Sequence, residues 1–218
     1  MRSEKDAFWA KMMSPGQKEI LLNLTIRELT ERTLPDFLAY FDRVAFADNP
    51  EWAHCYCYFH HADQNQPGWD KPTGAAENRA AVCGLVKQGR MRGYLAYIED
   101  QVVGWCHAAP RTLIPNLQKN PDLESAEMET TGAIVCFVVA KAHRGTGVAT
   151  QLLDAALQGF RQQGLTWAEG YPRRNAVGGA ANYHGPLSLF TGAGFQTVRE
   201  LPNFWIVRKR LTEPCLVT

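Results

Sequence analysis

The stretch from Ala133 to Leu153, AIVCFVVAKAHRGTGVATQLL, places three structural elements in direct succession. Its first seven residues form an unbroken apolar run rich in β-branched side chains, which predicts a strand buried on both faces. Gly145 and Gly147 then mark a sharp turn, and a helix with a single apolar stripe is expected from Gly147 to Gln163. The rest of the fold is expected to assemble around this strand, turn and helix.

The turn has the properties of an anion site. The first N–H groups of a helix have no partners within the helix and lie at the positive end of its dipole. A phosphate placed there satisfies these donors, and Arg144 adds positive charge. Two other phosphate motifs are excluded, because the third glycine of the Rossmann fingerprint is missing and Gly147 is followed by Val148-Ala149 rather than by Lys-Ser/Thr.

The flanking segments predict a mixed α/β chain. Alternating apolar and polar residues predict a first strand from Leu22 to Ile26, and Pro35 opens a helix. The expected order is strand, two helices, hairpin, buried strand, helix, strand, helix and two strands. The remaining elements are a helix at 75–88, a hairpin at 93–98 and 102–108, an irregular segment at 110–129, a strand at 166–169, a loop at 172–185, a helix at 186–191, and strands at 196–199 and 204–210.

Composition limits the classes of protein. The chain has 218 residues and a net charge of +1, so no electrostatic footprint indicates a nucleic-acid partner. No apolar run approaches the ~20 residues that span a bilayer, and the charged start of the chain is not a secretory signal. Six scattered cysteines are typical of free thiols in a reducing compartment, which predicts a cytoplasmic protein.

The hexapeptide Arg144-Gly145-Thr146-Gly147-Val148-Ala149 resembles the acetyl-coenzyme A signature of the GNAT superfamily of N-acetyltransferases, Arg/Gln-x-x-Gly-x-Gly/Ala. Ala193-Gly194-Phe195 is similar to the second cofactor-side motif of that family. The resemblance covers Leu22 to Leu211. It implies an α/β (mixed α+β) fold with a central mixed, mostly antiparallel sheet flanked by helices. The domain is expected at 21–212, with an N-terminal helical extension at 1–20 and a tail at 213–218.

The resemblance also implies which residues bind acetyl-CoA as co-substrate, with no metal expected. Backbone groups of Phe137, Val138 and Val139 would pair with the pantetheine arm like an added strand, where the strand splays from its neighbour. One N–H there could polarise the thioester carbonyl. The pyrophosphate would be held by N–H groups of Arg144, Gly145, Thr146, Gly147, Val148, Ala149 and Thr150.

The proton donor departs from the family pattern. Members often carry a tyrosine five residues before the phenylalanine of the closing Gly-Phe, and that position is Phe190, whose phenyl ring cannot donate a proton. Tyr183 is the proposed substitute, with Ser188 or a water as alternatives; it could instead pack over the cofactor or lie on the surface. Glu129 is the candidate base, since the family commonly places a carboxylate before the buried strand, and is otherwise a surface acid.

Residues 54–61, HCYCYFHH, contain several potential metal ligands. Zinc sites usually need a second ligand pair at a distance, and no such pair stands out in the sequence. An acceptor-binding wall made of Trp52, Tyr56, Tyr58 and His61 is the preferred interpretation, because aromatic faces suit an amine by cation–π contact. Core packing under the first two helices is the alternative.

The function expected from the sequence is acetyl-CoA-dependent N-acetylation of a primary amine, of a small molecule, by direct transfer in a ternary complex. A non-catalytic acyl-CoA-binding module is the alternative suggested by Phe190, and a protein N-acetyltransferase is a third. An uncovered N-terminal helix would suit a homodimer contact.

Overall fold

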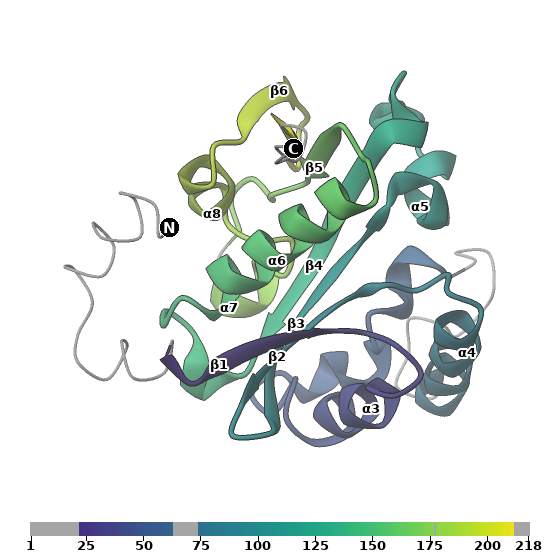
Figure 1. Ribbon diagram of the computed structural model, residues 1–218, viewed down its shortest axis with the longest axis vertical. Helices are drawn as coiled ribbons and strands as arrows, with labels where there is room; N and C mark the ends of the chain where they lie inside the picture. Colours follow the sequence, from purple (N-terminus) through teal and green to yellow (C-terminus); the bar gives the residue numbers. More distant parts are fainter. Residues whose placement is uncertain (1–21, 63–73, 177, 212–218) are drawn as a thin grey trace, which may run out of the picture.

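A seven-stranded sheet forms the centre of the computed structural model, which describes residues 22–62, 74–176 and 178–211. The strands lie in the order β1-β2-β3-β4-β5-β7-β6, and among them only β4 and β5 are parallel neighbours. The predicted fold class, a mixed and mostly antiparallel sheet flanked by helices, is confirmed (Figure 1). The expected extension at 1–20 and tail at 213–218 lie outside the described residues.

Every strand expected from the sequence is present, with slightly shifted ends. Successive side chains of a strand point to opposite faces. In the predicted hairpin, Tyr94 and Ala96 therefore pack with one helix layer, while Leu95 and Tyr97 pack with the other. The strands are β1 (Leu24–Glu28), β2 (Gly93–Ile98), β3 (Gln101–Pro110), β4 (Thr131–Val139), β5 (Trp167–Gly170), β6 (Gln196–Glu200) and β7 (Trp205–Arg210).

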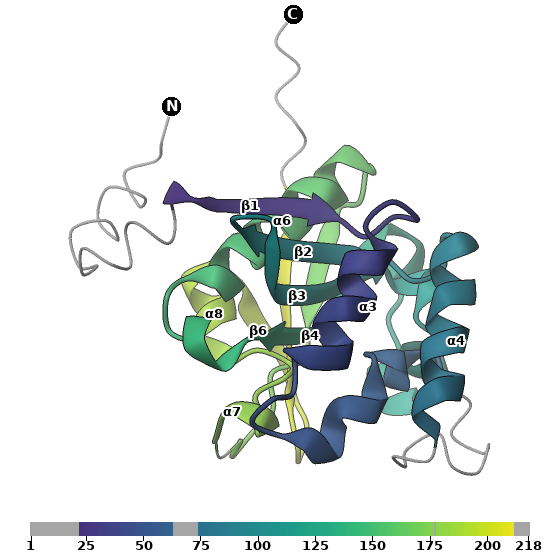
Figure 2. The same ribbon diagram turned by 90° about the horizontal axis from the view of Figure 1, so that it is seen from below.

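Helices cover both faces of the sheet. The long helix α6 (Val148–Gln162) and α8 (Leu187–Gly192) pack on one face, and α3 (Leu34–Arg43) and α4 (Ala75–Lys87) pack on the other (Figure 2). The predicted apolar stripe of α6 is buried against the sheet through Leu152, Leu153, Ala156 and Phe160. Burial of this stripe anchors the N-terminus of α6 beside the end of β4.

Regions expected to be irregular contain short helical turns. Between β3 and β4 the chain forms η4 (Arg111–Leu113), α5 (Pro115–Lys119), η5 (Pro121–Leu123) and η6 (Met128–Thr130). The connection from α3 to α4 includes η1 (Pro50–Cys55) and η2 (Tyr58–His60). Turns this short carry no apolar periodicity, so sequence patterns could not predict them.

Candidate active site

Strand β4 separates from β5 halfway along its length. The two strands are paired only from Thr131 to Ile134. On the other side, the register with β3 shifts between His107 and Ala108, so that Val135 is an extra residue in β4. A bulge of this kind bends the strand and ends regular pairing. The splay implied by the family resemblance is therefore present, directly before Phe137.

Residues 183–184 lie against the edge of β4 that faces the splay. The Phe137 N–H donates to the carbonyl of Tyr183 at 2.6 Å. The Nδ1 of His184 donates to the carbonyl of Val135 at 2.8 Å, which leaves the lone pair on Nε2 because a carbonyl oxygen only accepts. Burial lowers the pKa of His184 to about 4, so this imidazole is neutral at neutral pH.

The turn before α6 has the geometry that the sequence predicts for an anion site. Gly145 and Gly147 have φ values of 74° and 93°, a region that favours glycine. A Cβ added at Gly145 would meet no atom within 4 Å, so the turn is open there. The Gln151 N–H donates the first hydrogen bond of the helix, to the Gly147 carbonyl. Gly147 is the N-cap residue, so no N-cap side chain accepts from the N–H groups that precede Gln151 in α6. These donors fit a diphosphate.

Arg144 does not direct its charge solely at this turn. Its guanidinium makes a bidentate ion pair with Asp48, at 2.6 and 2.9 Å, and its Nε donates to the carbonyl of Val139 at 2.9 Å. The hydrogen bond from Arg144 lowers the pKa of Asp48. The side chain thus ties the turn to the end of β4 and to the loop after α3, and the backbone supplies most of the anion site.

A cavity of about 610 Å³ opens beside the splay. A volume of this size is typical of small-molecule sites. Tyr183 and His184 belong both to its wall and to the segment on the β4 edge. The other lining residues come from 59–60, 116–123, 171–173 and 203–204.

Of the two predicted catalytic residues, the structure brings one to this cavity. The Tyr183 ring packs edge-on against Trp52, with ring centroids 5.4 Å apart, and burial raises the pKa of its hydroxyl to about 12. Glu129 is exposed in η6, before the start of β4, and does not line the cavity. Since a strand rises about 3.3 Å per residue, Glu129 lies roughly 25 Å along the chain from Phe137.

Phe190 is a core residue. Its side chain is fully buried, and its ring lies 6.2 Å from that of Phe137 and 5.2 Å from that of Phe195. It packs so closely on β5 that a Cβ added at Gly170 would lie 2.3 Å from it. The place of the usual family tyrosine is therefore filled by apolar packing.

The predicted acceptor wall is only partly at the site. Trp52 touches Tyr183, but none of the four wall residues lines the cavity; Phe59 and His60 of the same segment do. Tyr56 is buried, stacks on Phe41 and donates to Asp42 at 2.6 Å, which is the alternative of core packing. Tyr58 likewise packs against the core cluster under α3 and α4.

His61 belongs to a buried cluster rather than to the cavity wall. Its Nε2 lies 3.4 Å from Nε2 of His107, whose Nδ1 lies 3.4 Å from the Cys57 sulfur. Burial lowers the pKa of His61 to about 4 and that of His107 well below its usual value. A hydrogen bond with Cys57 and burial raise the pKa of the Cys136 thiol. Within the described ranges, no three histidine, cysteine or acidic side chains are gathered as a metal-ligand set.

Several cavity residues had no signal in the sequence. His184 and Asn203 lie in loops without a motif, whereas Arg173 belongs to the short basic pair Arg173-Arg174; the three residues meet only in three dimensions. His184 could have been suspected only from its position beside Tyr183. Tertiary structure is therefore what identifies the neutral imidazole of His184 as a polar group of the site.

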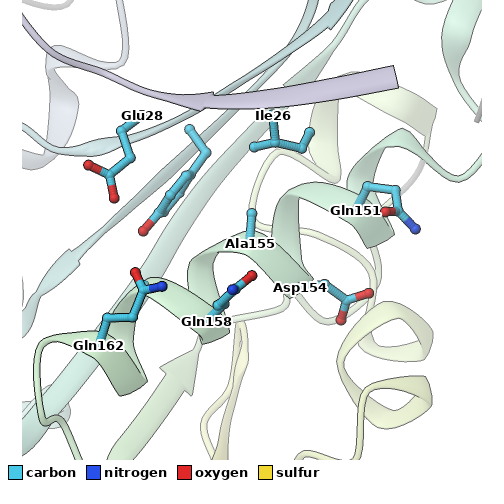
Figure 3. A pocket seen from close by; sticks show the side chains of 9 residues that line it. Ile26, Glu28, Gln151, Asp154, Ala155, Gln158 and Gln162 are labelled. Atoms are coloured by element: carbon cyan, nitrogen blue, oxygen red, sulfur yellow. The ribbon is translucent and has the colours of Figure 1, made fainter. Parts of the chain in front are cut away.

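A second, smaller hollow of about 350 Å³ lies between β1 and α6 (Figure 3). Figure 3 shows Glu28, Gln151, Asp154, Gln158 and Gln162 around it. None of its described lining residues belongs to β4, β5 or the loop at 172–186, so it is separate from the splay. In the described part of the chain, no helix has both the length and the hydropathy required to cross a bilayer.

Comparison with known proteins places this geometry in a family. Similar solved structures include an N-acetyltransferase from Staphylococcus aureus Mu50 (16% identity, 87% of this chain and 99% of that chain, TM-score 0.54). Others are a GCN5-related N-acetyltransferase from Kribbella flavida (16%, 88% and 99%, 0.53) and the PaiA N-acetyltransferase from Thermoplasma acidophilum in complex with coenzyme A (13%, 86% and 98%, 0.52). These likenesses show a shared fold.

No curated protein sequence gives a significant match. A family model does match, that of the acetyltransferase (GNAT) family, over residues 27–178. This range includes the end of β1, the splayed strand β4, the turn Arg144–Ala149 and the whole of α6. The chain therefore belongs to the GNAT acetyltransferase family.

Proposed function

We propose that this chain transfers the acetyl group of acetyl-CoA to a primary amine of a small molecule, directly, in a ternary complex of enzyme and both substrates. The observation that carries this proposal is the splay of β4 from β5, because Tyr183 and His184 of the cavity wall lie on the splayed edge of β4. The uncapped N-terminus of α6 follows the same strand. Family membership supports acyl transfer, and the size of the cavity supports a small acceptor. The CoA-bound relative from Thermoplasma acidophilum supports the choice of donor.

In this proposal, backbone groups bind the acetyl donor, acetyl-CoA. N–H groups from Arg144 to Thr150 hold the diphosphate, and the β4 edge at Phe137, Val138 and Val139 pairs with the pantetheine arm. Acetyl-CoA supplies an acetyl thioester that is activated toward a neutral amine. The Phe137 N–H is engaged by the Tyr183 carbonyl at 2.6 Å, so pairing at Phe137 requires this carbonyl to withdraw. Donor binding and the position of residues 183–184 are therefore coupled.

In this proposal, side chains donate the proton to the leaving group and orient the acceptor amine. The hydroxyl of Tyr183 stays protonated at neutral pH, because burial raises its pKa to about 12. It donates its proton to the departing thiolate as the C–S bond breaks, and the proton that the amine loses as the C–N bond forms restores the hydroxyl. The Nε2 lone pair of His184 accepts a hydrogen bond from the acceptor amine and orients it. With a pKa near 4, this imidazole is too weak a base to deprotonate an ammonium group, so the acceptor enters as the neutral amine.

Calorimetry with acetyl-CoA, followed by thiol release in the presence of a panel of small primary amines, tests the proposal. Binding together with release for at least one amine is the expected result. The absence of binding at millimolar acetyl-CoA would refute the donor site.

A non-catalytic acyl-CoA-binding module is the second candidate, and the buried Phe190 in place of a tyrosine favours it. Binding without thiol release across the small-amine panel and a matching panel of peptides would support that candidate. Release with peptides alone would instead support a protein N-acetyltransferase.

A further inference from the structure

The charge of the acceptor cavity indicates more about the acceptor than its size does. Lys119 and Arg173 line the cavity, and no described lining residue is a carboxylate. The two histidines of the wall, His60 and His184, are held neutral because burial lowers the pKa of each. The described wall therefore carries positive charge only, and nothing in it compensates the charge of a polycation.

The buried carboxylate behind this wall is already neutralised. Glu169 accepts a hydrogen bond from the hydroxyl of Tyr171 and forms ion pairs with Arg111 at 3.5 Å and with Arg208 at 3.3 Å. Arg111 also donates to the Tyr171 hydroxyl at 3.0 Å. Because two guanidinium groups surround it, Glu169 gives the cavity no negative field with which to attract an amine-rich ligand.

Arg173 is available for a ligand in a way that its neighbour is not. Among the described residues Arg173 forms no ion pair, whereas Arg174 is paired with Glu200 at 3.2 Å and lies over the Trp205 ring. The Arg173 guanidinium lies 5.9 Å from the centroid of the Tyr183 ring, and its charge contributes to the low pKa of His184. A cation thus lies close to the two side chains assigned to the reacting end.

We propose that the acceptor is a primary amine that also carries an anionic group, a carboxylate or a phosphate, and that Arg173 binds this group while the amine lies at His184 and Tyr183. This inference rests on the proposed transferase function. A guanidinium fork matches either oxyanion in a bidentate way. Lys119, which also lines the cavity, adds long-range attraction. Polyamines and other polycations are expected to be poor acceptors.

Matched amines test the proposal on the full chain. Thiol release from acetyl-CoA is measured with phenylalanine, phenylalanine amide and phenethylamine, and with O-phosphoethanolamine, ethanolamine and spermidine. Phenylalanine is compared with phenylalanine amide and phenethylamine, which lack its carboxylate. O-Phosphoethanolamine is compared with ethanolamine, which lacks its phosphate, and spermidine represents the polycations. Arg173→Gln is the test variant, and Arg174→Gln, next in sequence but outside the cavity wall, is its control.

The wild-type chain is expected to prefer an anionic amine over its neutral counterpart by about 10- to 100-fold in kcat/KM, the worth of one charged hydrogen bond. Arg173→Gln should erase this preference, and Arg174→Gln should keep it. Equal turnover of neutral amines or spermidine, or a preference unchanged in Arg173→Gln, would overturn the inference while leaving the transferase function intact. If acetyl-CoA binds but no amine releases thiol, the transferase proposal and this inference fall together.

Discussion

The donor half and the acceptor half of the cleft are built in different ways. The proposed donor half consists of backbone groups from one stretch of chain, the end of β4 and the turn Arg144–Thr150. The acceptor half consists of side chains from segments far apart in sequence, among them His60, Arg173 and His184. A site made of backbone groups needs only glycines and the start of a helix, so a short sequence motif can identify it. A site made of side chains from distant segments has no such motif.

The strongest test of this difference is Gly147→Trp. At φ 93° a non-glycine residue costs about 1–2 kcal/mol, and the indole would cover the N-terminus of α6. Loss of two or more charged hydrogen bonds lowers acetyl-CoA affinity by about 100-fold or more, measured by calorimetry. Gly164→Trp is the matched control, since Gly164 has a φ of 73° at the other end of α6 with no atom within 4 Å of an added Cβ.

Both glycine variants should lose similar stability, and only Gly147→Trp should lose affinity. If Gly147→Trp binds acetyl-CoA as the wild type does, the donor half is wrongly placed.

The second test concerns side-chain chemistry in the acceptor half. Tyr183→Phe keeps the ring that packs on Trp52 and removes the hydroxyl. We expect kcat to fall by about 100-fold, the lower range for general acid catalysis, with little change in acetyl-CoA affinity. Tyr58→Phe is the control, because Tyr58 comes from the sequence-predicted wall but does not line the cavity. An unchanged kcat in Tyr183→Phe would remove this residue from the mechanism.

Acid should destabilise the protein through two buried histidines, His184 in the acceptor half and His61 in the cluster outside the cavity wall. The pKa values of His61 and His184 fall from an ordinary 6.5 to about 4, so the unfolded chain binds more protons between these values. Stability is therefore full above pH 6.5 and is lost as pH falls toward 4. At pH 5 each histidine lowers the free energy of unfolding by about 2 kcal/mol, and the two together lower Tm by about 10 °C. His61→Gln should reduce the fall in Tm between pH 7 and pH 5; equal Tm values in the wild type would contradict the burial of these rings.

The smallest effect is expected at Asp48. Asp48→Asn removes the charge that neutralises Arg144 and leaves more positive potential at the donor turn. Acetyl-CoA affinity should rise by about two- to fivefold at low salt, in line with ~0.3–1 kcal/mol for an exposed charge near a helix end. Asp100→Asn, which breaks the distant pair with Arg27, is the control and should leave affinity unchanged. A weaker affinity for Asp48→Asn would mean that this pair positions the turn.

Sequence patterns predicted the sheet, the main helices and the donor turn, because each depends on local periodicity or on glycine. They did not predict the helical turns that line the acceptor cavity, α5 and η5, since these lack a periodic signal. From the segment of the predicted wall, only Phe59 and His60 line the cavity, and the chain turns there through the left-handed conformations of Tyr56 and Cys57, with φ 45° and 55°. No sequence pattern predicts this left-handed backbone conformation at non-glycine residues.

The sequence by itself predicted the family fold and the glycine turn before α6, because a buried strand, two glycines and an amphipathic helix are local patterns, and the residues around Gly147 exclude the other phosphate motifs. Tertiary structure alone decided the rest. It paired Arg144 with Asp48, buried Phe190 against the rings of Phe137 and Phe195, and set the Tyr183 carbonyl on the Phe137 N–H. The physical reason is that long-range packing and electrostatics choose partners by distance in space, which order along the chain does not encode locally.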